Sequence, residues 1–130
     1  MNDKFVISMM EYVEMDMEAA RELLEANNPK TCNHIVLCCQ QIIEKALKAF
    51  LAKKGVSFGG DHDTKLLCKK ASTVNSDFSK YMDICAEFKG IYIATHYPDY
   101  EGNKIEFSRK QAENYFIIAL EIYEIVKDNM

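Results

Sequence analysis

The segment that most constrains the fold runs from Asn33 to Gly55 and reads NHIVLCCQQIIEKALKAFLAKKG. It is the most apolar long segment of the chain, and a helix that is apolar on nearly all sides is usually the buried centre of a domain. Its middle is interrupted by a polar band that consists of Gln40, Gln41, Glu44, Lys45 and Lys48. Inside a buried helix, such side chains must be paired or must open onto a groove. We therefore expect the other segments to pack around this helix.

The rest of the chain shows the spacing of amphipathic helices and no sustained alternation typical of strands. Apolar side chains recur at helical spacing over residues 3–25, 29–54, 64–72 and 77–94, and again after residue 108. Only two prolines and five glycines occur, which favours long helices over a many-turned β protein. We predict a single domain over residues 1–130, an all-α up-and-down bundle of four longer helices and one short helix.

Residues that begin and end helices stand at the predicted boundaries. Asn28 before Pro29 is a typical N-cap, and Gly55 is typical of the position that follows a helix. The other expected caps are Asp63, Ser76 and Ser108, the last in a capping box with Gln111. Gly90, inside the predicted fourth helix, costs about 1 kcal/mol relative to alanine and indicates a kink or a close packing contact.

Charge and cysteine content exclude several classes of protein. A formal net charge of −4 argues against a nucleic-acid binder that relies on an overall basic surface, although lysines cluster on and after the central segment. The five cysteines are odd in number and form no C-x-x-C pair, so we interpret them as small buried residues in a reducing compartment. No signal peptide and no membrane-spanning segment is recognised, and we expect a cytoplasmic protein without membrane association.

The polar band of the central helix has two interpretations. Gln41, Glu44 and Lys48 share one helix face, and Glu44 precedes Lys48 by four residues, the favourable order for an intrahelical ion pair. Either these side chains pair with one another and with a neighbouring helix, or they form, with Lys45, one wall of a groove. Such a wall would accept a phosphate-bearing ligand or a partner.

The loops supply further candidate residues. Asp63 is expected to cap a helix, while His62 before it either hydrogen-bonds within the loop or lines a site. The longest irregular segment opens with His96, Tyr97, Pro98 and Asp99. Loops of this kind often carry function. Alternatively, the proline only ends the helix and the tyrosines cover the end of the bundle.

Motifs for other chemistries are missing from the sequence. There is no glycine-rich phosphate loop, no H-E-x-x-H motif and no nucleophile elbow. His34 at a helix start is expected to be structural, and three isolated histidines without spaced carboxylates make a weak metal site. We expect neither a metal nor a cofactor.

Three segments of the chain carry a recognisable pattern, in this order: residues 41–51, Gly55 with residues 62–64, and residues 97–99. Together they resemble the HEPN domain, a small helical domain of prokaryotic proteins. Residues 41–51, QIIEKALKAFL, are similar to the family pattern Q-x-x-E-K-A-L-K-A-x-L. Gly55 with residues 62–64, HDT, is similar to its G…H-D-L segment, with Thr in place of Leu. Residues 97–99, YPD, are similar to its R-Y-P-D motif. With the expected last helix, the resemblance covers nearly the whole chain.

The resemblance implies a four- to five-helix bundle that commonly dimerises and is often encoded with, or fused to, a minimal nucleotidyltransferase. Many members are toxins that cleave RNA without a metal, through an R-x(4–6)-H motif near the dimer interface. This chain departs from that motif, because neither Arg21 nor Arg109 precedes a histidine at that spacing. His96 stands where the R-Y-P-D motif has arginine. Guanidinium stays charged and grips phosphate with two prongs, whereas imidazole is mostly neutral near pH 7.

We therefore expect a non-catalytic HEPN protein of the kind found in two-component toxin–antitoxin modules. It would bind a minimal nucleotidyltransferase partner, a nucleotide or RNA in a groove between the central helix and residues 96–99. The expected ligand-binding residues are Gln41, Glu44, Lys45, Lys48, His62, His96, Tyr97 and Asp99.

Two alternatives remain open for the function. One is a metal-independent RNase toxin with His96 as acid or base and Lys45 or Lys48 as phosphate clamp. The other is a homodimeric scaffold without a ligand. The family resemblance predicts a homodimer for each of these functions.

Overall fold

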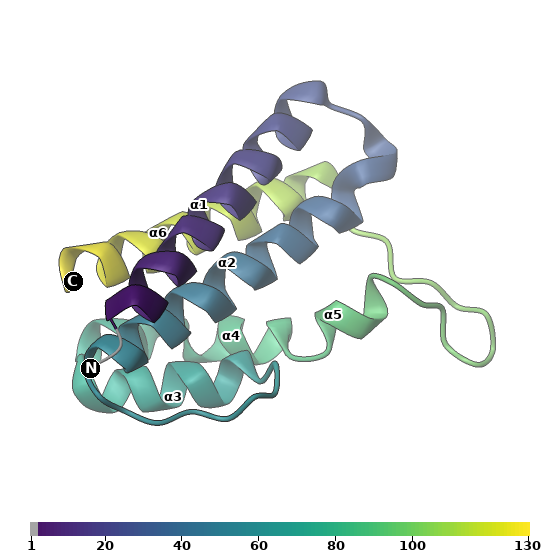
Figure 1. The fold of residues 1–130 in the computed structure, drawn as a ribbon. Helices are drawn as coiled ribbons and strands as arrows, with labels where there is room; N and C mark the ends of the chain where they lie inside the picture. The colour runs from purple at the N-terminus through teal and green to yellow at the C-terminus, as the bar shows by residue number, and fades with distance from the viewer. Residues whose placement is uncertain (1–2) are drawn as a thin grey trace.

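The computed structural model describes residues 3–130, except for the side chain of Tyr92, and every regular element in this range is helical. Two short 3-10 helices, η1 (Pro29–Thr31) and η2 (Ser76–Tyr81), precede α2 and α4. The predicted all-α bundle is confirmed (Figure 1). The α-helices are α1 (Asp3–Ala26), α2 (Cys32–Lys53), α3 (Thr64–Val74), α4 (Met82–Phe88), α5 (Ile91–Ala94) and α6 (Arg109–Asp128).

Helix α2 lies at the centre of the bundle, as its apolar sequence predicts. It contacts α1, α3, α5 and α6 and contributes more buried residues than any other helix described. Phe50 of α2 is fully buried and packs edge-on against Phe78 of η2, with 4.8 Å between the ring centroids. Each fully buried side chain of this size stabilises the fold by about 2 kcal/mol. In Figure 1, α3 lies beside the C-terminal half of α2 and α4 packs against α3, while α5 and the loop after it project from the bundle.

Most of the predicted helix ends are confirmed. The side chains of Asn28 and Asp63 accept hydrogen bonds from the backbone of Lys30 and Leu66, and Ser108 forms the expected capping box. Gly55 adopts a φ of 72° after α2. There the N–H of Val56 donates to the carbonyl of Leu51, as in a Schellman motif, which favours glycine because the left-handed backbone strains other residues. The Ser76 cap is wrong, since Asn75 accepts the hydrogen bond from Asp77 N at 2.9 Å.

The fourth predicted helix, residues 77–94, is not continuous. It divides into η2, α4 and α5, and Gly90 separates the last two with a φ of 87°. Helical backbone needs a negative φ, so Gly90 interrupts the helix instead of merely bending it. The break sets the direction of α5 and therefore of the loop that follows.

Tyrosine–glutamate hydrogen bonds fasten α6 to its neighbours. They join Tyr81 to Glu121, Tyr115 to Glu87, and Tyr123 to Glu14 of α1, at 2.9, 3.1 and 2.8 Å. Burial, together with the hydrogen bond to the glutamate, raises the pKa of Tyr81 and of Tyr123 to about 12.

The cysteines are free thiols, and all but the half-buried Cys38 are buried, close to the prediction. Within residues 3–130, none of the helices combines the length and the apolar character needed to cross a bilayer.

Candidate functional site

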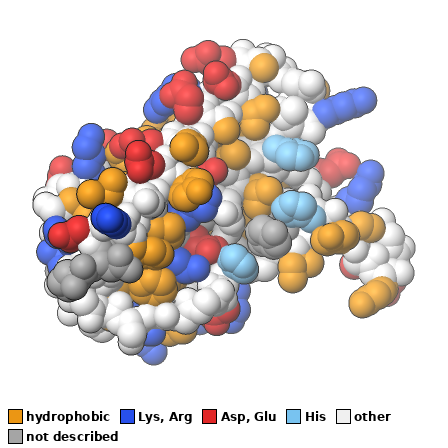
Figure 2. Space-filling model, viewed as in Figure 1, with side chains coloured by type: hydrophobic (Ala, Val, Ile, Leu, Met, Phe, Trp, Pro, Cys, Tyr) orange, Lys and Arg blue, Asp and Glu red, His pale blue; other side chains and the backbone are white. Residues whose placement is uncertain are grey.

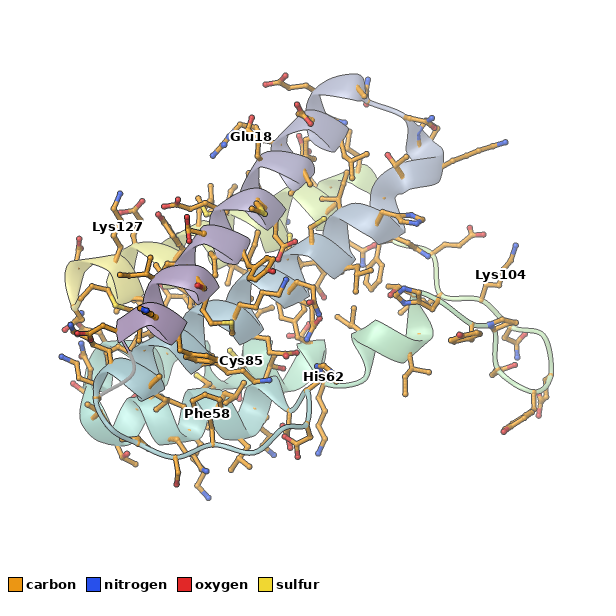
Figure 3. All side chains as sticks on the ribbon, in the orientation of Figure 1. Glu18, Phe58, His62, Cys85, Lys104 and Lys127 are labelled. Atoms are coloured by element: carbon orange, nitrogen blue, oxygen red, sulfur yellow. The ribbon has the colours of Figure 1, made fainter. Side chains whose placement is uncertain are left out.

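Glu44 is the centre of a buried hydrogen-bond network in the middle of α2. This residue is only 4% exposed, and its carboxylate accepts hydrogen bonds from Gln40 Nε2 at 2.8 Å and from Lys48 Nζ at 3.0 Å. His62, in the loop between α2 and α3, reaches both carboxylate oxygens with Nδ1, at 3.0 and 2.9 Å (Figure 3). Gln41 Nε2 extends the network by donating to Gln40 Oε1 at 2.6 Å.

The network keeps the Glu44 carboxylate ionised despite its burial. Burial raises the pKa of this carboxyl, but the hydrogen bonds from Lys48, His62 and Gln40 outweigh it, so the pKa lies below its ordinary value. An ionised carboxylate only accepts hydrogen bonds, so His62 must donate from Nδ1. The interaction therefore fixes the ring orientation and the position of this proton.

These contacts agree with the pairing interpretation of the polar band. Lys45 turns to the other side of α2, where its Nζ lies 2.7 Å from Asp16 Oδ2 of α1 and 5.6 Å from the centroid of the Tyr12 ring. Asp63 caps α3 and lies 3.4 Å from Lys89 Nζ. The polar residues of α2 thus hold the neighbouring loop and helices to the central helix.

A pocket of about 510 Å³ lies between the start of α2 and the loop after α5. Its lining includes Lys30 on the helix side, and His96, Tyr97, Lys104 and Glu106 on the loop side. The His96 and Tyr97 rings are 6.2 Å apart, and the Tyr97 side chain is 70% exposed. Figure 2 shows the histidines of the chain on one face of the molecule, with the loop projecting beside them.

Two side chains hold the loop in shape. Asp99 accepts hydrogen bonds from the N–H groups of Asn103 at 2.8 Å and Glu101 at 2.9 Å, and these bonds keep the pKa of its carboxyl below the ordinary value. Gly102, with a φ of 87°, closes this turn. Asn33 at the start of α2 donates to the carbonyl of Ile105 and accepts from the N–H of Phe107. Asp99 therefore shapes the loop, and Asn33 joins the loop to the bundle.

The structure places the predicted site residues in two clusters. Gln41, Glu44 and Lys48 share the network around Glu44 with the exposed His62, whereas His96 and Tyr97 line the pocket. Among the described residues, the lining of that pocket includes none of the polar band of α2. The groove therefore involves the first turn of the central helix instead of its middle.

Sequence reasoning missed Lys30, Asn33 and Lys104 as pocket residues. Each is a polar residue in or beside a loop, without a spacing that distinguishes it from a solvated side chain. The one available signal for a site there is that two polar residues, Lys30 and Asn33, lie on either side of the first residue of the most apolar helix.

The comparisons with known proteins fit this architecture. The family model of the HEPN domain matches residues 8–129. No curated protein and no solved structure gives a significant match. The match begins within α1 and includes the whole of α2, α3 and α6 and both clusters of candidate residues. On this evidence of sequence and fold, the chain belongs to the HEPN domain family.

Proposed function

We propose that this HEPN protein is a non-catalytic binding protein that holds a nucleotide, or the end of an RNA, in the pocket between α2 and the loop after α5. The observation that carries the proposal is the set of side chains around this pocket. Lys30, Lys104 and His96 can donate to phosphate oxygens, and Tyr97 offers an exposed aromatic face for a base.

Size and charge favour a small ligand over a long RNA. A volume of about 510 Å³ falls within the range of small-molecule pockets. Binding a long RNA requires many cationic contacts to its phosphates. The pocket has two lysines, Glu106 lies among them, and the chain as a whole carries a formal charge of −4. These charges suit the few phosphate groups of a single nucleotide.

The positions of the arginines support binding without cleavage. Arg21 pairs with Glu18 at 3.1 Å on α1, and Arg109 lies 3.6 Å from Glu113 on α6. Neither arginine is among the described residues that line the pocket. His96 therefore shares the pocket with two lysines, and not with the rigid guanidinium that stabilises a phosphorane-like charge with two parallel hydrogen bonds.

Calorimetric titration with ATP and with AMP tests the binding proposal. We expect saturable binding with a Kd on the order of 100 µM or tighter. The Lys30→Ala/Lys104→Ala variant should bind at least about tenfold more weakly, because it lacks two charge-assisted hydrogen bonds. The matched control is Lys65→Ala/Lys69→Ala, which removes the same charge from the exposed face of α3. Equal weakening in both variants, or no binding by the wild type, refutes the proposal.

The RNase alternative is tested by incubating RNA with the protein in EDTA. We expect no cleavage above that of a protein-free sample. Cleavage by the wild type that disappears in His96→Ala would establish the toxin alternative in place of the binding function.

We further propose a minimal nucleotidyltransferase as the protein partner and a homodimer as the assembly. Exposed apolar side chains on two helices, Ile7 and Met15 of α1 and Ile117 of α6, support a protein contact. Coexpression with a minimal nucleotidyltransferase, taken from the neighbouring gene where that gene encodes one, should yield a stable complex on size exclusion. Separate elution of the two proteins refutes the partner. Sedimentation that finds only a 15.0 kDa species refutes the dimer.

A further inference from the structure

Asn33 makes a two-pronged contact with a segment more than seventy residues further along the chain. Its side-chain Nδ2 donates to the carbonyl of Ile105 at 2.8 Å, and its Oδ1 accepts from the N–H of Phe107 at 3.0 Å. A side-chain amide offers the same donor and acceptor as a backbone peptide. Asn33 therefore makes the pair of hydrogen bonds with residues 105–107 that the backbone of a neighbouring β-strand would make, although Asn33 itself lies on a helix.

The contact fixes one wall of the pocket. Asn33 itself lines the pocket, and the segment that it holds carries Lys104 and Glu106, which also line it. Next to the contact, Phe107 packs edge-on against Tyr115 of α6, with 5.8 Å between the ring centroids. The hydrogen bonds of Asp99 stay within the loop, so they do not fix its position relative to α2.

We propose that Asn33 is a positioning residue of the pocket, which acts on the ligand through Lys104. By holding Ile105 and Phe107 against α2, it keeps the Lys104 ammonium group where a phosphate meets it. The inference rests on the proposed nucleotide-binding function. Asn33 contacts the loop and determines the fraction of protein molecules that is competent to bind the ligand.

The expected size of the effect follows from preorganisation. Without the two hydrogen bonds, the loop samples positions in which Lys104 is out of reach, and the apparent Kd rises in inverse proportion to the fraction of protein that remains competent. Two hydrogen bonds at a partly exposed site correspond to a rise of about tenfold in Kd.

A double-mutant cycle of Asn33→Ala and Lys104→Ala distinguishes the positioning of Lys104 from a general loosening of the loop. We expect Asn33→Ala to weaken ATP binding about tenfold in the wild-type background and less than about twofold in the Lys104→Ala background. Additive effects would mean that Asn33 does not act through Lys104 and would overturn the proposal. Asn75→Ala is the matched control, because Asn75 also uses its side chain for two hydrogen bonds, to Asp77 and Asn129, away from the pocket.

Amide hydrogen exchange of the ligand-free protein tests the contact independently of any nucleotide. In Asn33→Ala the Phe107 amide should exchange at least about tenfold faster. In Asn33→Asp the carboxylate still accepts from this N–H, so its protection should be largely retained. Unchanged exchange in Asn33→Ala overturns the positioning role alone. If exchange changes as expected in the variants but the wild type binds no ATP, the proposed function is refuted, and the positioning role with it.

Discussion

Glu44 shows how a charged residue is accommodated in the most apolar helix of the chain. Its carboxylate is almost completely withdrawn from solvent and accepts hydrogen bonds from Gln40, Lys48 and His62. Removing one partner of such a network leaves the others buried without compensation, which costs more than the net strength of the interaction itself. Glu44 is therefore part of what holds the loop of His62 to α2.

Replacing Glu44 should lower the free energy of unfolding substantially. Glu44→Ala leaves the Lys48 ammonium, itself 12% exposed, without its acceptor, and we expect a loss of about 3 kcal/mol. Urea unfolding followed by circular dichroism measures the change. Glu124→Ala, at an exposed position of α6, is the control and should change the free energy by less than about 0.5 kcal/mol. Similar values for the two variants would contradict the structural role of Glu44.

The same residue predicts a dependence of stability on pH. The pKa of Glu44 is lowered in the folded protein, so its contribution is complete above the ordinary value of 4.5 and is lost as the pH falls through the folded-state pKa. The difference in unfolding free energy between the wild type and Glu44→Gln should therefore shrink as the pH is lowered below 4.5. A difference that stays constant over this range would show that the carboxylate does not titrate as described.

Some residue-level contacts follow from the sequence and others do not. The Glu44–Lys48 pair follows from its four-residue spacing, because helix geometry alone brings the two side chains together. The contact of Asn33 with Ile105 joins positions 72 residues apart, and no local pattern specifies it. For His62 the sequence left open a hydrogen bond within its loop or a place in a site, and neither interpretation named its partner Glu44.

At the level of elements, Gly90 decides where the long fourth segment stops being a helix. The apolar spacing continues through residues 77–94, and this is why the sequence predicts one helix there. The interruption depends on the sign of φ at a single glycine. The spacing of apolar residues contains no information about this sign. Capping residues were more informative, because an Asn, Asp or Ser cap acts on the backbone of its immediate neighbours.

Substituting Gly90 by alanine distinguishes a continuous helix over residues 77–94 from a helix that is broken at Gly90. In a continuous helix, Gly90→Ala would stabilise the protein by about 1 kcal/mol. With the observed φ of 87°, alanine is strained, and we expect a loss of about 1 kcal/mol in the free energy of unfolding. Gly60→Ala is the control, because a Cβ there meets nothing within 4 Å and the backbone is not left-handed. A gain in stability for Gly90→Ala would contradict the break.

For the whole molecule, the central apolar segment was sufficient to predict the arrangement of the helices around α2. A helix that is buried on nearly all sides needs neighbours on every side, and over residues 3–130 these neighbours are helices. The position of the pocket was not predictable in the same way. It depends on how α5 and its loop leave the bundle, and the break at Gly90 and the contact of Asn33 determine this direction.

The central claim is that the pocket beside the loop, and not the polar band of α2, holds the ligand. The most direct measurement is the change in backbone amide chemical shifts when ATP is added to isotopically labelled protein. We expect shifts confined to the amides of residues 30–33 and 94–107, with little change at Gln41, Glu44, Lys48 and His62. Shifts centred on those four residues, or no shifts at saturating ATP, would contradict it.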